Sequence, residues 1–348
     1  MNKRIIKKII NPLFLIATFA LTIWYIFHDE DLGELICLLG SSNAYCYIPA
    51  ILCVIGFILS ESVIIHYMLR TLSIRVPFPH CCLYSFIGFF YSSITPSASG
   101  GQPMQIMGMR KDGIPVAVSS VILAIVTITY KLVLALIGLT IVIWQPAAIM
   151  RHLDPVMGVI YLGLALNVIC IVILLLLVFH PELARFLAQK ILLLLKKLRL
   201  VRNLEKQQNR LDRVLSQYQD AAQYYRSHQM VILRVFLITL VQRILLFLIT
   251  WFVYLSFSLS GHSVSLIATL QAMISVAADM LPLPGGIGIS ESLFLSIFPG
   301  IFGEDLLLPA MVLSRGISFY TQLLLCATMT IIASFILGKK RKKGLNRL

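Results

Sequence analysis

The chain has 348 residues, of which 59% are hydrophobic and only 13% charged, and its net charge is +14. A mean hydropathy of +0.90, with several apolar runs long enough to cross a hydrocarbon core of about 30 Å, excludes an ordinary soluble domain. The positive charge lies in loops and tails beside the apolar runs, so it predicts orientation and contact with anionic inner-leaflet lipids; we expect no nucleic-acid partner.

The hydrophobic pattern predicts an all-α polytopic membrane protein with eight apolar segments. In chain order they cover residues 11–27, 45–69, 80–95, 115–144, 156–179, 229–257, 265–281 and 308–337. Basic residues precede the first segment and form a tail at 339–348 after the last one. The positive-inside rule therefore places both termini in the cytoplasm, which requires an even number of full crossings.

Eight simple crossings do not fit the loop charges. Arg70 and Arg75 precede segment 80–95, and Arg110 follows it, so both sides of that segment are expected in the cytoplasm. Segment 80–95 and residues 103–112 then form a re-entrant hairpin, and residues 265–303 form a second one that enters from the opposite face. Each half has two crossings, a re-entrant hairpin and one crossing, which gives an inverted-topology repeat with six full crossings.

These boundaries divide one flippase-like membrane domain, residues 1–348, into two repeats. The first covers residues 1–150, and the second covers 151–338 and includes a basic linker at 181–229. Apolar residues recur at helical spacing in the linker, which favours an amphipathic helix on the inner leaflet. A solvated helix that joins the halves is the alternative.

Two breaks rich in glycine and proline interrupt the apolar segments at matching places. They read TPSASGGQP at residues 95–103 and LPLPGGIGISE at residues 281–291. Lipid cannot satisfy the backbone polar groups of such breaks, so they must be buried in protein or line a polar cavity. We expect Pro103 to begin one helix and Ser290 to cap the other, with free N–H groups that attract an anion such as phosphate. Simple glycine-permitted turns are the alternative.

Three cations lie inside apolar segments, where charge is costly and by default marks a pathway or a partner. Lys131 and Arg243 lie near the middle of their crossings, and the repeat makes Arg315 the counterpart of Lys131. They are expected to pair with a lipid phosphate or with acidic residues of the same protein. The acidic candidates, which are also the candidate proton carriers, are Glu61, Asp279 and Glu291.

The breaks and the cations together define the candidate substrate-binding residues. They are Gly100, Gly101, Gln102, Lys131, Arg243, Gly285, Gly286, Gly288, Ser290, Glu291 and Arg315. The sequence shows no nucleophile with a nearby base, no pair of carboxylates at a catalytic spacing and no cluster of metal ligands. We therefore expect no catalytic residue, metal or cofactor.

With these motifs the chain resembles the lysylphosphatidylglycerol synthase transmembrane family, also described as the flippase-like domain family. The resemblance covers nearly the whole chain and is most specific at LPGGIGISE. In that family Glu tends to follow Gly-Gly in the first motif, where this chain has Gln102. An acidic residue tends to precede Arg in the next helix, where this chain has Tyr130 and Lys131.

The resemblance implies a bacterial plasma membrane and a role in phospholipid transport. In full synthases the membrane region is said to flip aminoacylated phosphatidylglycerol, and a cytoplasmic C-terminal domain performs aminoacyl transfer; no such domain is expected here. We expect a translocase for an anionic or aminoacylated phospholipid such as lysylphosphatidylglycerol. One alternative is a membrane subunit that needs a separate soluble aminoacyltransferase, and this alternative leaves open whether the protein takes part in an enzyme reaction. The other alternative is a small-solute transporter. No ATP-binding motif is present, which leaves passive scrambling or an ion gradient.

Overall fold

The computed structural model describes residues 40, 42–180, 204–281 and 283–345, together with residues 183, 185, 186 and 190. This part of the chain is helical and contains no strand, which confirms the predicted all-α fold. Segment 11–27 and most of the linker before residue 204 lie outside the described residues. The main helices are α3 (Tyr47–Thr71), α4 (Phe78–Ser93), α5 (Gly101–Lys111), α6 (Val116–Trp144), α7 (Ala147–Leu153), α8 (Met157–Phe179), α10 (Leu204–Ser227), α11 (Gln229–Ser256), α12 (Val264–Ala278), α13 (Ile289–Ile297), α14 (Pro299–Phe302), α15 (Glu304–Arg315) and α16 (Gln322–Leu345).

Five helical stretches are long and apolar enough to cross a membrane. They are Ala44–Thr71, Val116–Trp144, Ala147–Phe179, Gln229–Ser256 and Glu304–Ala333. The last of these joins α15 to α16 through a π-helical segment, Gly316–Thr321. A π segment inserted in a helix frequently marks a functional site. The lengths and apolar character of these helices confirm a multi-pass membrane protein.

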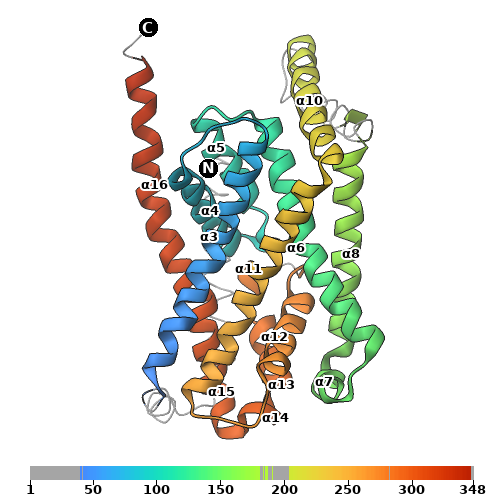
Figure 1. The fold of residues 1–348 in the computed structure, drawn as a ribbon, viewed down its shortest axis with the longest axis vertical. Helices are drawn as coiled ribbons and strands as arrows, with labels where there is room; N and C mark the ends of the chain where they lie inside the picture. Colours follow the sequence, from blue (N-terminus) through green and yellow to red (C-terminus); the bar gives the residue numbers. More distant parts are fainter. Residues whose placement is uncertain are drawn as a thin grey trace, which may run out of the picture.

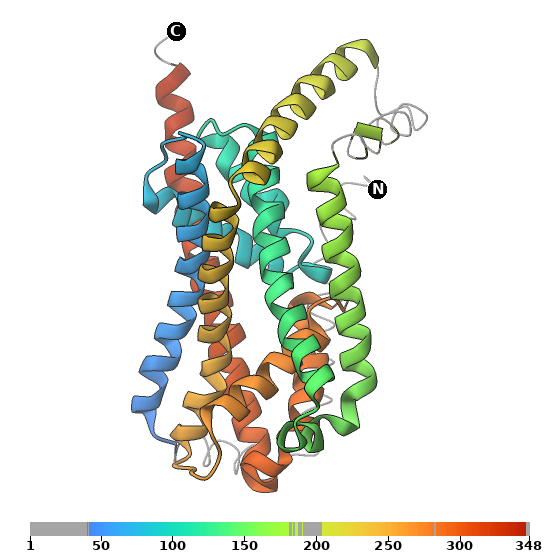
Figure 2. The same cartoon turned by 45° about the vertical axis from the view of Figure 1, so that its right-hand side comes forward.

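The long helices pack side by side, with α3 along α11 and α6 along α8 (Figure 1). Helices α4 and α5 pack against each other, and α4 also packs on α16. Figures 1 and 2 show α4 and α5 near the end of the bundle that carries α10, whereas α12, α13 and α14 lie near the opposite end. The two interrupted helix pairs therefore approach the middle of the bundle from opposite ends.

Both interruptions contain a 3₁₀ turn, and the helices that follow begin earlier than expected. Helix α5 begins at Gly101, so Pro103 takes the third position rather than the first. That position tolerates proline because the first four N–H groups of a helix have no intrahelical partner. Helix α13 is capped at Gly288, not at Ser290 as predicted. Gly288 has φ +87°, which favours glycine, and its N–H donates to Glu291 Oε2 at 2.7 Å.

Helices α8 and α12 approach closely enough for their backbones to touch. A Cβ atom at Gly163 of α8 would lie 2.4 Å from the Val276 carbonyl oxygen and 2.7 Å from Ala277 Cα. Asn167, one turn further along α8, donates to the same Val276 carbonyl at 3.3 Å. The first limb of the second interrupted pair is therefore held tightly against a long helix.

Helix α10, in the linker, docks on the end of the bundle. Tyr225 is fully buried, and its hydroxyl donates to the Met68 carbonyl of α3 at 2.9 Å. Tyr218 donates to the Leu177 carbonyl of α8 at 3.2 Å. The C-terminal end of the linker, which the structure describes, thus packs against the helix bundle. The residues for which an amphipathic surface helix was predicted lie mostly before residue 204.

Candidate functional site

The two breaks meet inside the bundle. The 3₁₀ turn Pro96–Ala98 of the first break contacts the 3₁₀ turn Pro284–Gly286 of the second. Beside them lies a cavity of about 500 Å³, and helices α3, α4, α5, α6, α11, α12 and α15 all contribute to its walls. This volume lies within the usual range for a ligand site. The cavity is therefore the structure's best candidate for a binding site at the breaks.

On one side of the second break, Lys131 of α6 forms an ion pair with Asp279, the residue after α12. Lys131 Nζ lies 2.6 Å from Asp279 Oδ2, and Lys131 is only 5% exposed. Tyr130 OH donates to the other carboxylate oxygen, and Asn167 Oδ1 accepts from Lys131 Nζ at 3.4 Å. A buried ion pair is tolerated when further hydrogen bonds satisfy both ions, and this pair has them.

On the other side of the same break, Arg315 at the end of α15 pairs with Glu291 of α13. Arg315 Nε donates to Glu291 Oε1 at 2.7 Å, and its terminal NH2 donates to the Gly285 carbonyl at 3.1 Å. Gly285 has φ +59°, and a Cβ there would lie 2.2 Å from a ring carbon of Phe319 in the π segment. The fold needs glycine at this position because any side chain would collide with that ring.

The first break is held by hydrogen bonds rather than by ion pairs among the described residues. Thr95 Oγ1 accepts the Gly100 N–H at 2.8 Å, and Gln102 Nε2 donates to Thr127 Oγ1 of α6. Gln105 Nε2 donates to Glu61 Oε1 of α3 at 2.5 Å. Among the described residues, no ion pair reaches the turn at the first break.

Arg243 of α11 stands apart from the other two cations. Its guanidinium lies 4.0 Å from the centre of the Tyr130 ring and 5.3 Å from that of Phe57, and it lines the cavity. Its Nε atom is buried and has no hydrogen-bond partner. Within the described part of the chain Arg243 forms no ion pair. A buried guanidinium nitrogen without a hydrogen-bond partner is costly, so the arrangement favours an anionic ligand.

The structure brings most of the predicted site residues together. Those that line the cavity are Gln102, Lys131, Arg243, Gly285, Gly286, Ser290 and Arg315. Glu291 lies behind Arg315 and is 3% exposed. Gly100, Gly101 and Gly288 are not among the lining residues.

The expectation of free N–H groups at the glycines is not met where the structure shows their partners. The Gly100 N–H is bonded to Thr95, the Gly286 N–H to the Leu283 carbonyl at 3.2 Å, and the Gly288 N–H to Glu291. The turns fold tightly enough to satisfy their own donors. Positive charge in the cavity therefore comes from side chains rather than from these backbone groups.

The sequence did not predict several uncharged polar residues at or beside the cavity as part of the site. Thr250 Oγ1 donates to Gln271 Oε1 at 2.9 Å and lies 3.0 Å from Ser314 Oγ, so α11, α12 and α15 share one network. Gln105 and Asn167 were missed as well. Single uncharged polar residues in apolar helices give a weak sequence signal, because Ser and Thr can bond to their own helix backbone.

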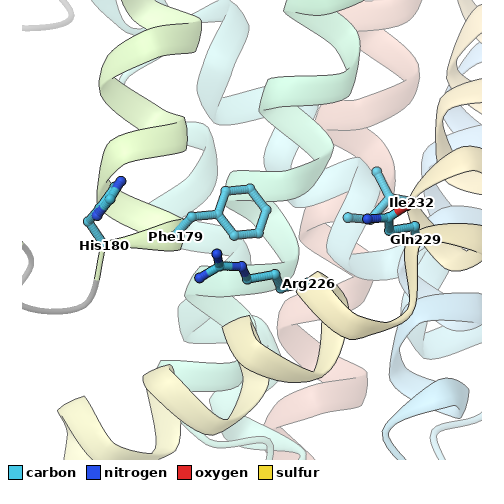
Figure 3. Close-up of a pocket in the computed structure, with 5 residues that line it drawn as sticks. All are labelled: Phe179, His180, Arg226, Gln229 and Ile232. Atoms are coloured by element: carbon cyan, nitrogen blue, oxygen red, sulfur yellow. The ribbon is translucent and has the colours of Figure 1, made fainter.

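A second, smaller cavity of about 320 Å³ lies where α8 ends and α10 meets α11 (Figure 3). Its lining residues are Phe179, His180, Arg226, Gln229 and Ile232. It contains none of the predicted site residues and lies away from both breaks.

Comparison with known families gives one match. A family model described as "Lysylphosphatidylglycerol synthase TM region" matches residues 12–326. Because the match covers most of the chain, the chain belongs to this family and is a membrane protein of it. A comparison with curated proteins gave no match.

Proposed function

We propose that this member of the lysylphosphatidylglycerol synthase transmembrane family translocates a phospholipid between leaflets through the central cavity. The substrate is an anionic or aminoacylated phospholipid such as lysylphosphatidylglycerol. The observation that carries the proposal is Arg243, a mid-helix cation that lines the cavity at the two breaks, forms no ion pair among the described residues and has a buried Nε atom without a hydrogen-bond partner. A phosphodiester offers this guanidinium a negative charge and hydrogen-bond acceptors at close range.

The arrangement of the interrupted helices supports a translocation path. Helices α4 and α5 approach from one end of the bundle and α12 and α13 from the other, and their turns touch. We interpret these pairs as two re-entrant hairpins of an inverted-topology repeat within a single domain. In such folds the substrate site lies at the repeat interface near the bilayer midplane. Glu61, Lys131 and Arg243 all lie near the middle of their long helices.

Orientation and localisation follow from the same proposal. From the basic residues of the tail and of the loops we infer that both termini lie on the cytoplasmic side of a bacterial plasma membrane, where anionic lipids attract such residues. The family relationship suggests the bacterial membrane.

The test is lipid translocation in proteoliposomes that contain the purified protein. Fluorescent phosphatidylglycerol and lysylphosphatidylglycerol are compared for the wild type and for Arg243→Ala. We expect translocation above that of empty liposomes and a loss of about tenfold or more in the variant, since a hydrogen bond to a charged group contributes ~1.5–3 kcal/mol. Thermal unfolding is measured in parallel, because the variant also loses the contacts of Arg243 with the Tyr130 and Phe57 rings, at a cost of ~0.5–2 kcal/mol.

Arg234 provides the matched control. It lies on the same helix, is exposed and donates to Tyr67 OH at 3.3 Å, outside the cavity. Arg234→Ala should translocate like the wild type. Absence of translocation of both lipids by the wild type would overturn the proposal and favour a membrane subunit, to be tested by co-purification of a soluble aminoacyltransferase.

A further inference from the structure

We propose that Glu61 is a proton-binding site and that an anionic headgroup enters the cavity together with a proton. This inference rests on the proposed function, because it requires that the cavity receives a lipid headgroup. It names the energy source of transport, which is the proton gradient, and the residue through which that gradient acts.

The first step is the charge balance of the cavity. Three cations, Lys131, Arg243 and Arg315, stand against three carboxylates, Glu61, Asp279 and Glu291. Four of these six groups are engaged in the two ion pairs of the second break. Glu61 and Arg243 remain, and neither forms an ion pair among the residues that the structure describes.

Glu61 and Arg243 nevertheless act on each other. Both line the cavity, and the electrostatic field of Arg243 reaches the Glu61 carboxylate. A headgroup phosphate that binds Arg243 neutralises this field and brings one extra negative charge into a space of low dielectric constant. Uptake of one proton by Glu61 restores neutrality, so phosphate and proton bind cooperatively.

Among the described cavity residues around Glu61, Arg243 is the cation that is not already engaged in an ion pair. Helix α11 contributes Arg243, α16 contributes the buried thiol of Cys326, and α5 contributes the neutral Gln105. On α6, Lys131 and Tyr130 are bound to Asp279. The cavity residues of α4 are Gly88, Phe89, Ser92 and Ser93, which carry no ionisable side chain.

The two other carboxylates are each held in an ion pair. Asp279 accepts from Lys131 and Tyr130, and Glu291 accepts from Arg315 and from the Gly288 N–H. Protonation of either one would remove an ion pair that holds the second break in place. Protonation of Glu61 breaks no ion pair, since its bond from Gln105 Nε2 survives in the neutral acid. The geometry therefore selects Glu61.

The experiment counts protons taken up on binding. Short-chain phosphatidylglycerol is titrated into the detergent-purified full chain by calorimetry, in buffers of different ionisation enthalpy. We expect uptake of about one proton per lipid at pH values where free Glu61 is ionised, and an affinity that rises by up to about tenfold per pH unit as the pH falls. Short-chain phosphatidylethanolamine, whose net charge is zero, should bind without proton uptake.

Glu61→Gln mimics the protonated acid and keeps an oxygen that accepts from Gln105. It should bind phosphatidylglycerol without proton uptake and without pH dependence, whereas Glu304→Gln, a matched change at an exposed residue outside the cavity, should behave like the wild type. Proton uptake that persists in Glu61→Gln, binding by the wild type without uptake, or no binding at all would overturn the inference. Proton-linked binding without translocation would instead leave the site in place and overturn the proposed function.

Discussion

The two breaks occupy matching places in the chain but are held in different ways. The second break is fixed by two ion pairs, Lys131 with Asp279 and Arg315 with Glu291. The first break is held by hydrogen bonds, such as the one from Gln102 to Thr127, and has no ion pair among the described residues. Lys131 and Arg315, the cations that follow the first and the second break in the sequence, thus both form ion pairs at the second break.

This difference separates two roles within the cavity. A turn fixed by buried ion pairs costs much to displace, whereas neutral hydrogen bonds exchange readily with water or with a ligand. We infer that the second break forms a rigid wall of the site and that the first break is the part that adjusts when a headgroup enters. Arg243 and Glu61, which form no ion pair among the described residues, line the same cavity.

The largest effect is expected for Lys131→Ala. This change leaves the Asp279 carboxylate buried without its cation, which costs ~3–5 kcal/mol when a buried pair loses one partner. The midpoint of thermal unfolding in detergent should fall accordingly. Lys131→Met with Asp279→Asn should recover much of the loss, because the double variant leaves no unpaired charge. A single variant as stable as the wild type would show that the second break is not fixed in this way.

Sequence reasoning found the helices, the breaks and most of the charged residues, because Gly/Pro interruptions and charges stand out in apolar segments. It left open which acid pairs with which cation, since Lys131 and Asp279 lie 148 positions apart in the sequence and only the packing of α6 against α12 joins them. It also expected free backbone donors at the breaks. Turn closure by Thr95 and Glu291 depends on local conformation that composition does not reveal.

A smaller loss of stability is expected when alanine replaces a glycine in the helices beside the two breaks, and this loss should differ between the breaks. Gly163→Ala places a Cβ against the backbone of α12, 2.4 Å from the Val276 carbonyl, and should destabilise the protein by ~1–3 kcal/mol, as overpacking does. Gly88→Ala on α4 meets no backbone but the side chain of Gln105, from Nε2 at 2.2 Å to Cγ at 2.7 Å. Gln105 can turn away without a shift of the backbone, and the better helix propensity of alanine offsets part of its lost bond to Glu61, so the unfolding midpoint should fall less than that of Gly163→Ala.

Equal destabilisation by the two alanines would contradict this contrast, because it would mean that the helices of the first break are packed as rigidly as those of the second. Thermal unfolding of both variants under the same detergent conditions decides the point. Binding of phosphatidylglycerol by Gly88→Ala then reports whether displacement of Gln105 alone disturbs the cavity.

The smallest effect is expected for Gln102→Ala at the first break. Gln102 is exposed to the cavity and loses a single neutral hydrogen bond, so the cost should stay below about 1 kcal/mol. Thr127→Val removes the same bond from the other side, and the double variant should unfold where the single variants do, because only one interaction is lost. A shift as large as that of Lys131→Ala would mean that the first break is fixed as firmly as the second. Additive shifts would mean that Gln102 and Thr127 act through separate contacts rather than through their shared hydrogen bond.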